Sequence, residues 1–360
     1  MTGKERIKRI LAHEPVDRIG VFEHFWNDTC VDYVAKGKIP AGEDFDEHFG
    51  LDMSVFWVLN LVLDLDFEPV TVSEDADTYC VRDGNGALLR QHKHHDTTPE
   101  HIEYAIKCQD DWGKVKHMLE NTANDERRID FSAYREKKQA AEKGGRFFCI
   151  GGVNVFEAMH PISGHEHMLV GMALEPDWIL DMAATYTRLI IRLQKLLFER
   201  EGLPDGVWYY EDMGFKERPF MSPAMYEELI MPSHKQTFDH AHSLGLPVIV
   251  HSCGFVEPLL PGMIAAGMDC LQVIEVKAGM DLLRIYREHG DKIALMGGID
   301  VRKLYTNDKK MIDEELERII PIVKQGFGYV AHSDHSIPKT VEYETFRYYL
   351  EKVLELGKYE

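Results

Sequence analysis

Short apolar runs alternate with amphipathic stretches along most of the chain, and this pattern predicts strands that alternate with helices. The strand-like runs begin at Arg18, Met53, Arg146, Gly206, Leu246, Met268, Lys292 and Gly328. Strands separated by helices form a parallel sheet, and eight such units predict a closed (β/α)8 TIM barrel. A doubly wound open sheet is the alternative fold, although no Gly-x-Gly-x-x-Gly segment follows any strand.

Residues 60–98 depart from this rhythm. Three short strand-like runs begin at Val70, Thr78 and Leu88, and Asp83-Gly-Asn-Gly86 is a hairpin turn signal. We therefore expect an antiparallel insertion after the second strand, inside one barrel domain that spans the whole chain, residues 1–360.

Two further segments lie between the insertion and the regular βα units. Thr98-Pro-Glu predicts the start of a helical region that continues to about Lys143. The histidine-rich segment after the Arg146 strand, with Glu157 and His160, predicts an irregular loop.

Charge and cysteine usage narrow the class of protein. The net charge of -20 argues against nucleic-acid or anionic-membrane surfaces, because both require basic patches. The six cysteines are scattered without the spacing of a disulfide framework, which is typical of reduced intracellular thiols. The first residues lack the apolar core of a signal peptide, and the longest helical apolar stretch is interrupted by charges. We expect a cytoplasmic protein without a membrane segment.

His251-Ser-Cys253 stands directly after the Leu246 run. In an extended segment the side chains of residues i and i+2 leave the same face, so this imidazole and this thiol point the same way. A β/α barrel carries its chemistry at the carboxyl ends of its strands. One nitrogen and one sulfur donor supply two of the three protein ligands of a catalytic zinc site. The pattern predicts such a site, with a buried thiol beside a hydrogen-bonded imidazole as the structural alternative.

The third ligand has several candidates. His335, after the last strand, would complete a His/Cys/His set, and His332 offers the same donor. Glu275 and Asp212 are alternative ligands at the ends of other strands. Zinc suits mixed nitrogen and sulfur donors better than magnesium or calcium does. Asp334 could orient a ligating imidazole by accepting a hydrogen bond from its other ring nitrogen, or it could form an ordinary ion pair.

Five segments share a further pattern: Glu14-Pro-Val-Asp-Arg18, Gly214-Phe-Lys-Glu-Arg-Pro-Phe-Met-Ser-Pro223, His251-Ser-Cys-Gly254, Gly297-Gly-Ile-Asp300 and His335-Ser-Ile-Pro338. With them the chain resembles the uroporphyrinogen decarboxylase superfamily from about Glu5 to Leu356. The resemblance implies a (β/α)8 barrel, in agreement with the strand count. The superfamily includes decarboxylases and methyltransferases, so fold does not settle the chemistry.

The decarboxylases resemble one another in having arginines after the first strand and an aspartate after the second. Here the two segments read Glu23-His-Phe-Trp-Asn-Asp28, without arginine, and Phe56-Trp-Val-Leu-Asn60, without aspartate. Their absence removes the main electrostatic support for decarboxylation of a carboxylated tetrapyrrole. A decarboxylase-like lyase is therefore the second hypothesis.

The zinc-dependent corrinoid methyltransferases carry His-x-Cys at the fifth strand, which matches His251 and Cys253, and a cysteine near the eighth, where this chain has His335. This branch implies Zn²⁺ and a small methyl donor or thiol acceptor. It also implies a cobalamin on a separate corrinoid protein, because the chain has no Asp-x-His-x-x-Gly segment. A barrel that binds a corrinoid or another ligand without turnover is the third hypothesis.

On this reading the remaining polar strand ends surround the reactants. Asp212, Glu275 and Asp300 would handle protons or bind substrate through hydrogen bonds. The predicted substrate-binding residues are His24, Trp26, Trp57, Glu211 and His160. Each of these side chains could instead cap a helix, form an ion pair or pack at the rim of the barrel.

Overall fold

The computed structural model describes residues 1–94 and 99–359, and its centre is an eight-stranded parallel sheet. The strand order is β1-β12-β11-β10-β9-β8-β7-β2. The strands are β1 (Gly20–Val21), β2 (Met53–Trp57), β7 (Phe147–Val153), β8 (Gly206–Tyr210), β9 (Val248–Ser252), β10 (Cys270–Val273), β11 (Ala294–Gly297) and β12 (Tyr329–Ala331). The predicted (β/α)8 barrel is confirmed.

Asp52 joins the two edge strands of this sheet. Its backbone N–H donates to the carbonyl of Val21 over 2.9 Å, and its carboxylate accepts the N–H of Val21 over 2.9 Å. Arg6 and Arg18 each approach the same carboxylate to 2.7 Å, so the buried charge is paired. These contacts connect β1 to the start of β2 and complete the ring of strands.

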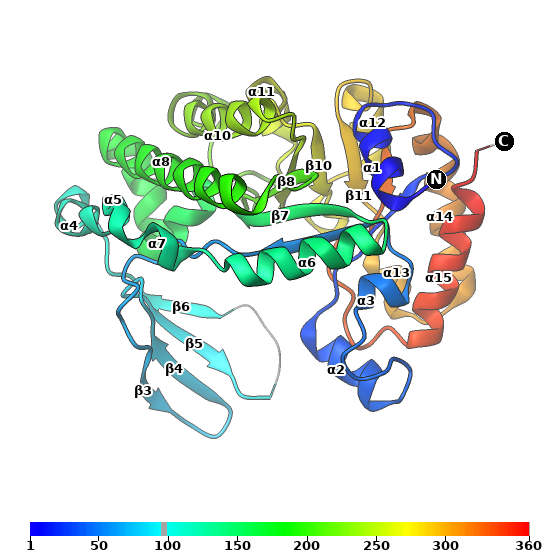
Figure 1. Ribbon diagram of the computed structural model, residues 1–360, viewed down its shortest axis with the longest axis horizontal. Helices are drawn as coiled ribbons and strands as arrows, with labels where there is room; N and C mark the ends of the chain where they lie inside the picture. The colour runs from blue at the N-terminus through cyan, green and yellow to red at the C-terminus, as the bar shows by residue number, and fades with distance from the viewer. Residues whose placement is uncertain (95–98, 360) are drawn as a thin grey trace.

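Helices pack around the barrel strands (Figure 1). They are α1 (Gly3–Leu11), α2 (Asn27–Ala35), α3 (Phe45–His48), α4 (Gln109–Val115), α5 (His117–Glu120), α6 (Phe131–Lys143), α7 (Val155–Leu174), α8 (Pro176–Glu201), α9 (Pro223–Met225), α10 (Met231–Ser243), α11 (Leu260–Ala266), α12 (Leu282–His289), α13 (Val301–Tyr305), α14 (Lys309–Val323) and α15 (Tyr343–Leu356).

The long helix α8 shows how the sequence sets the ends of a helix: Pro176 opens its first turn, and Gly202, at φ 78°, follows its last turn. Its buried face includes Trp178, Met182 and Leu189, which gives the helix its place against the core.

The insertion is a separate four-stranded antiparallel sheet that lies below the barrel in Figure 1. Its strands are β3 (Val70–Glu74), β4 (Thr78–Arg82), β5 (Leu88–His92) and β6 (Glu100–Glu103). The antiparallel insertion after the second strand is thereby confirmed, although residues 95–98 of the predicted segment lie outside the described residues.

The start of the helical region expected after the insertion was wrong, because Glu100–Glu103 form strand β6 and pair with β5. In this pairing Arg90 lies opposite Glu100, and the two side chains form an ion pair over 2.9 Å.

The predicted irregular loop after β7 was also wrong, because these residues form the start of α7. Pro161 and Gly164 (φ 68°) kink the helix and interrupt the pattern by which the sequence would have revealed it. The carboxylate of Glu211 accepts the N–H groups of Phe156 and Glu157 over 2.9 and 2.8 Å. A carboxylate at this position stabilises the first turn, so α7 forms despite its weak local signal.

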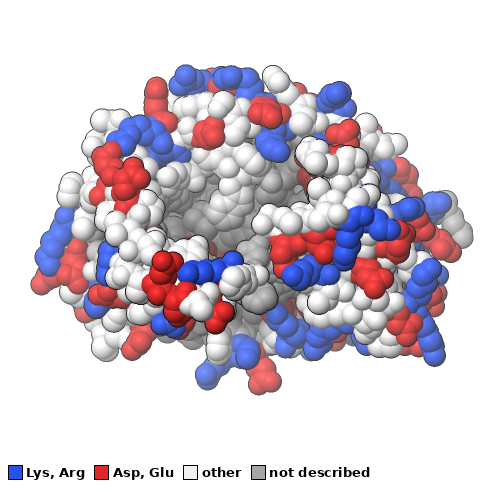
Figure 2. All heavy atoms as spheres, turned by 90° about the horizontal axis from the view of Figure 1, so that it is seen from below, with Lys and Arg blue, Asp and Glu red and all other residues white. Residues whose placement is uncertain are grey.

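The face seen in Figure 2, on the side of the insertion sheet and α2, is hollowed at its centre and carries most of its charged side chains around the hollow. Within the described part of the chain, no helix has both the length and the apolar character needed to cross a membrane.

Candidate functional site

The carboxyl ends of β8, β9, β10 and β12 surround a cavity of about 230 Å³. It is lined by His24, Trp26, Tyr210, His251, Cys253, Gln272, Val273, His332, His335 and Ser336. Tyr210 pairs with His251 in the sheet register, and His251 pairs with Gln272. Residues in register on neighbouring strands point to the same face, so these three side chains enter the barrel together.

A chain of hydrogen bonds fixes the protonation of the buried histidines. The Nδ1–H of His332 donates to the carbonyl of Ser333, so its Nε2 accepts from His24 Nδ1 over 3.0 Å and from Gln272 Nε2 over 3.4 Å. His24 Nε2 in turn accepts the hydroxyl of Tyr210 over 3.2 Å. Burial lowers the pKa of His332 to about 3 and that of His24 well below its usual value. Both imidazoles are therefore neutral in the folded protein.

The same network orients His251. Its Nδ1–H donates to Gln272 Oε1, which leaves a lone pair on Nε2. This Nε2 lies 3.3 Å from Cys253 Sγ and 3.4 Å from Asp212 Oδ1. One donor atom from each of His251, Cys253 and Asp212 lies within 4.8 Å of the others. A nitrogen, a sulfur and an oxygen donor thus converge, and zinc accepts all three.

The surroundings of Cys253 favour a cation. Burial raises the pKa of the thiol well above its usual value, and the carboxylates of Asp212 and Glu275 raise it further. The Cys253 N–H donates to Asp212 over 2.7 Å, and the Gly254 N–H donates to Glu275 over 2.6 Å. A metal ion stabilises the thiolate form, so this donor set fits a metal better than it fits a free thiolate.

The candidates for a third ligand differ in position. His335 lines the cavity, but its ring is stacked on Trp26 with the centroids 5.7 Å apart, and it is not part of the compact three-donor group. Both ring nitrogens of His332 are engaged in the hydrogen bonds described above. Of the alternatives, the carboxylate of Asp212 lies nearest to the imidazole and the thiol.

Of the predicted site residues outside the cavity lining, three carboxylates hold structural elements in place. Asp300 caps α13 and pairs with Arg302 at 2.8 Å. Glu211 is completely buried, caps α7 and bonds to His234 at 2.5 Å. Glu275 holds the loop after β9 through the backbone of Gly254. Their carboxylates position structural elements, which is the alternative that the sequence left open for each.

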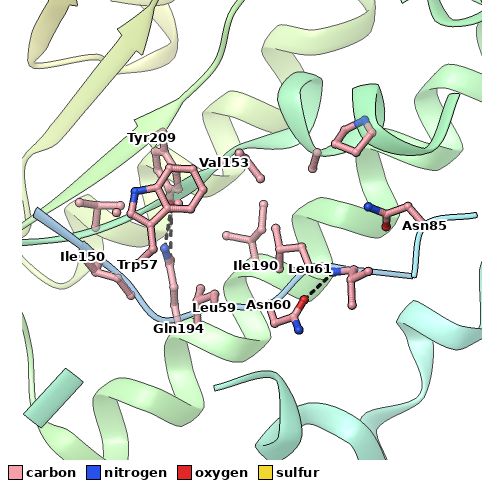
Figure 3. A pocket seen from close by; sticks show the side chains of 16 residues that line it. Trp57, Leu59, Asn60, Leu61, Asn85, Ile150, Val153, Ile190, Gln194 and Tyr209 are labelled. Atoms are coloured by element: carbon pink, nitrogen blue, oxygen red, sulfur yellow. Dashed lines mark hydrogen bonds between the residues drawn. The ribbon is translucent and has the colours of Figure 1, made fainter. Parts of the chain in front are cut away.

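Trp57 lines a second cavity, of about 330 Å³ (Figure 3). The second cavity lies between the outer side of β7 and β8 and the helices α7 and α8, and Gln194 there bonds to the hydroxyl of Tyr209 over 3.0 Å. The Trp57 ring is 4.7 Å from that of Tyr210, which lines the first cavity. The remaining predicted contact, His160, lies on α7 beside Glu157 and His165.

Comparison with known proteins agrees with the fold. The family model "Uroporphyrinogen decarboxylase (URO-D)" matches residues 206–356. A curated uroporphyrinogen decarboxylase of Carboxydothermus hydrogenoformans is similar over 137 residues at 29% identity, which is 38% of this chain and 38% of that protein. The part of the chain from residue 206 to residue 356 is thus similar to the uroporphyrinogen decarboxylase family. A solved structure titled as a methyltransferase from Methanosarcina mazei has the same fold, with 16% identity, a TM-score of 0.66 and 99% of each chain covered.

Within the barrel, sequence reasoning missed Gln272 and Tyr210 as site residues. Gln272 is the one polar side chain of the fully buried strand β10. A buried polar residue in an apolar strand requires a partner, which is the signal that could have identified it. Tyr210 alternates inward with Trp208 on β8, and strand periodicity could have placed both in the barrel.

Proposed function

We propose that this protein is a zinc-dependent methyltransferase that moves a methyl group between a small methylated compound or thiol and a corrinoid carried by a separate protein. The observation that supports this most is the convergence of His251 Nε2, Cys253 Sγ and Asp212 Oδ1 beside a cavity at the barrel mouth. Three protein ligands leave a coordination position for a reactant, as in catalytic zinc sites.

The chemistry that zinc supplies when bound is Lewis acidity, which lowers the pKa of a thiol or polarises a methoxy oxygen. The chain itself orients the donors: Gln272 sets the tautomer of His251, and Asp212 holds the backbone N–H of Cys253. Tyr210 lines the cavity, and the Trp57 ring packs against the Tyr210 ring with the centroids 4.7 Å apart. His24 and its hydrogen-bond partners line the cavity, and because His24 is neutral it adds no charge there.

The cavity suits a small reactant. Its volume of about 230 Å³ lies at the low end for ligand sites, which are commonly ~300–1,000 Å³. Neither arginine nor lysine occurs among the described residues that line it. A tetrapyrrole with many carboxylates would therefore lack both space and countercharge, which argues against the decarboxylase hypothesis.

The experiment uses the purified full-length chain. Zinc content is measured by mass spectrometry, and methyl transfer is followed by cobalamin absorbance in both directions, from methylcobalamin to thiols and from methoxy compounds to cob(I)alamin. His251→Ala and Cys253→Ser should each lose one equivalent of zinc and the transfer activity. Cys108→Ser is the matched control, because Cys108 caps α4 with no contact to the site and serine is a good capping residue.

Three outcomes count against the proposal. If neither substitution lowers the number of zinc ions bound per chain, His251 and Cys253 do not bind zinc. If zinc is bound but no donor or acceptor supports transfer, the protein is a binding barrel. Turnover of a porphyrinogen by the metal-free protein would establish the decarboxylase hypothesis.

A further inference from the structure

Outside the His251 site, a second group of metal-ligating side chains gathers on α7. Glu157, His160 and His165 each offer a donor atom that lies within 4.8 Å of the other two. Glu157 and His160 are separated by 3.5 Å between Oε1 and Nδ1. None of these residues is used by the proposed methyl transfer.

Two buried atoms of this group have no hydrogen-bond partner among the described residues, namely Glu157 Oε2 and His165 Nε2. Burial of an unpaired carboxylate oxygen or ring nitrogen costs free energy, and native proteins rarely leave such atoms unpaired. The two atoms belong to different residues of one compact group. A shared ligand that accepts lone pairs from both would remove both costs at once.

The backbone explains why the three side chains meet. Glu157 and His160 are i and i+3 on a helix and therefore lie on one face, the spacing with which Glu-x-x-His supplies two metal ligands in helical proteins. Gly164, at φ 68°, breaks the helix and returns His165 over His160. A Cβ at Gly164 would lie 2.2 Å from the Tyr104 ring, so glycine is required both for the bend and for this close approach.

We propose that Glu157, His160 and His165 form a second binding site, for a divalent transition-metal cation. Two imidazoles and one carboxylate suit zinc, cobalt(II) or iron(II), and the set leaves open coordination positions. His101 on β6 is a neighbouring donor, with its ring centroid 5.0 Å from that of His160. A cation here would connect α7 with the insertion sheet.

Coordination requires a small rearrangement. The His160 and His165 rings are stacked with centroids 3.9 Å apart and planes 10° apart, and Phe220 lies against His165 at 4.3 Å. Ring-nitrogen lone pairs lie in the ring plane, so two nearly parallel rings do not aim at a common point. One of the two rings must therefore tilt when both bind the same ion.

Cobalt(II) is a suitable probe because it absorbs visible light and reports thiolate ligation. The full-length chain is treated with a chelator, dialysed and titrated with Co²⁺ while bound metal is counted. Wild type should bind two ions per chain. His160→Ala/His165→Ala should bind one and keep the thiolate-to-cobalt charge-transfer band of Cys253, whereas His251→Ala/Cys253→Ser should bind one and lose that band.

Two additional variants keep the result interpretable. Glu157→Gln keeps the size of the side chain and should weaken the second equivalent by at least ~10-fold, even if the double histidine variant does not fold. His167→Ala is the matched control, two residues from His165 on the same helix and outside the three-donor group, and it should bind two ions.

The second site and the proposed function fail separately. One ion per chain in wild type, with the thiolate band present, overturns the second site and leaves the His251 site standing. Two ions bound by His160→Ala/His165→Ala also overturns it. If wild type binds a single ion that is lost in His160→Ala/His165→Ala but kept in His251→Ala/Cys253→Ser, the second site is supported and the zinc methyltransferase is contradicted.

Discussion

His251 on β9 donates its Nδ1–H to the side-chain oxygen of Gln272, its direct partner in register on β10. This hydrogen bond determines which nitrogen of His251 faces Cys253 and Asp212. The amide of Gln272 also donates to His332 over 3.4 Å, so one side chain links the buried histidines to the proposed metal ligands. Such partners behind a ligand fix its tautomer and orientation.

Gln272→Ala should lower the zinc affinity of the His251 site by ~10–100-fold without abolishing folding. The reason is that His251 loses the acceptor that keeps its Nε2 unprotonated and correctly aimed. Competition with a chromogenic chelator measures the affinity. Gln194→Ala is the control, since Gln194 makes a comparable buried hydrogen bond to Tyr209 in the other cavity. Equal affinity in wild type and Gln272→Ala would show that the hydrogen bond does not orient the ligand.

The sequence predicted the barrel because each parallel strand is a continuous apolar run, and it predicted His251 and Cys253 because strand geometry relates residues two apart. It could not predict the pairing of His251 with Gln272, which depends on the register between strands that are distant in sequence. The kinked α7 was missed because Pro161 and Gly164 resemble loop residues, whereas Glu211, far along the chain, stabilises its first turn. Long-range capping is not visible in local periodicity.

Asp300 and Asp212 should behave differently on mutation. Asp300→Ala removes the cap of α13 and should destabilise the fold by about 0.5–2 kcal/mol while methyl transfer at saturating substrate is little changed. Asp212→Ala should instead reduce zinc binding, because its carboxylate lies beside the imidazole and the thiol. Urea denaturation and zinc content separate the two effects. Loss of transfer in a folded, zinc-loaded Asp300→Ala protein would restore Asp300 to the catalytic group.

Gly254 should tolerate no side chain. Its φ is 78°, and a Cβ there would lie 2.3 Å from the carbonyl carbon of Gly214. Gly245 has a similar φ of 73° with nothing within 4 Å of the Cβ position, so it isolates the cost of the backbone conformation. Gly245→Ala should cost about 1–2 kcal/mol in the free energy of unfolding. Gly254→Ala should cost more and should also lose zinc, because the adjacent Cys253 must move.

Gly245→Ala and Gly254→Ala could instead lose similar amounts of free energy of unfolding and both keep zinc. This result would mean that the close approach of the loops after β8 and β9 does not position Cys253. Urea denaturation and zinc content provide both values from the same preparations.

Glu23 should give the fold a pH dependence. Burial raises the pKa of this carboxyl to about 8 and outweighs the hydrogen bonds from Tyr349 and Ser333, which lower it. The folded state therefore keeps a proton that the unfolded chain releases above about pH 4.5, so stability is greatest below that pH and falls as pH rises to about 8. Glu23→Gln should remove this part of the slope.

Urea midpoints measured from about pH 5 to about pH 9 for both proteins test the sign. Wild type should lose stability relative to Glu23→Gln across that range. Parallel curves would show that Glu23 is ionised in the folded protein.

Anomalous scattering from crystals of the zinc-loaded protein locates the ion relative to His251 and Cys253. We expect an anomalous peak at the barrel mouth, about 2.3 Å from Cys253 Sγ and about 2.0–2.1 Å from His251 Nε2, with Asp212 as the nearest carboxylate. Absence of a peak between these two atoms at full zinc loading, or a thiol turned away from the imidazole, would contradict the proposed zinc site.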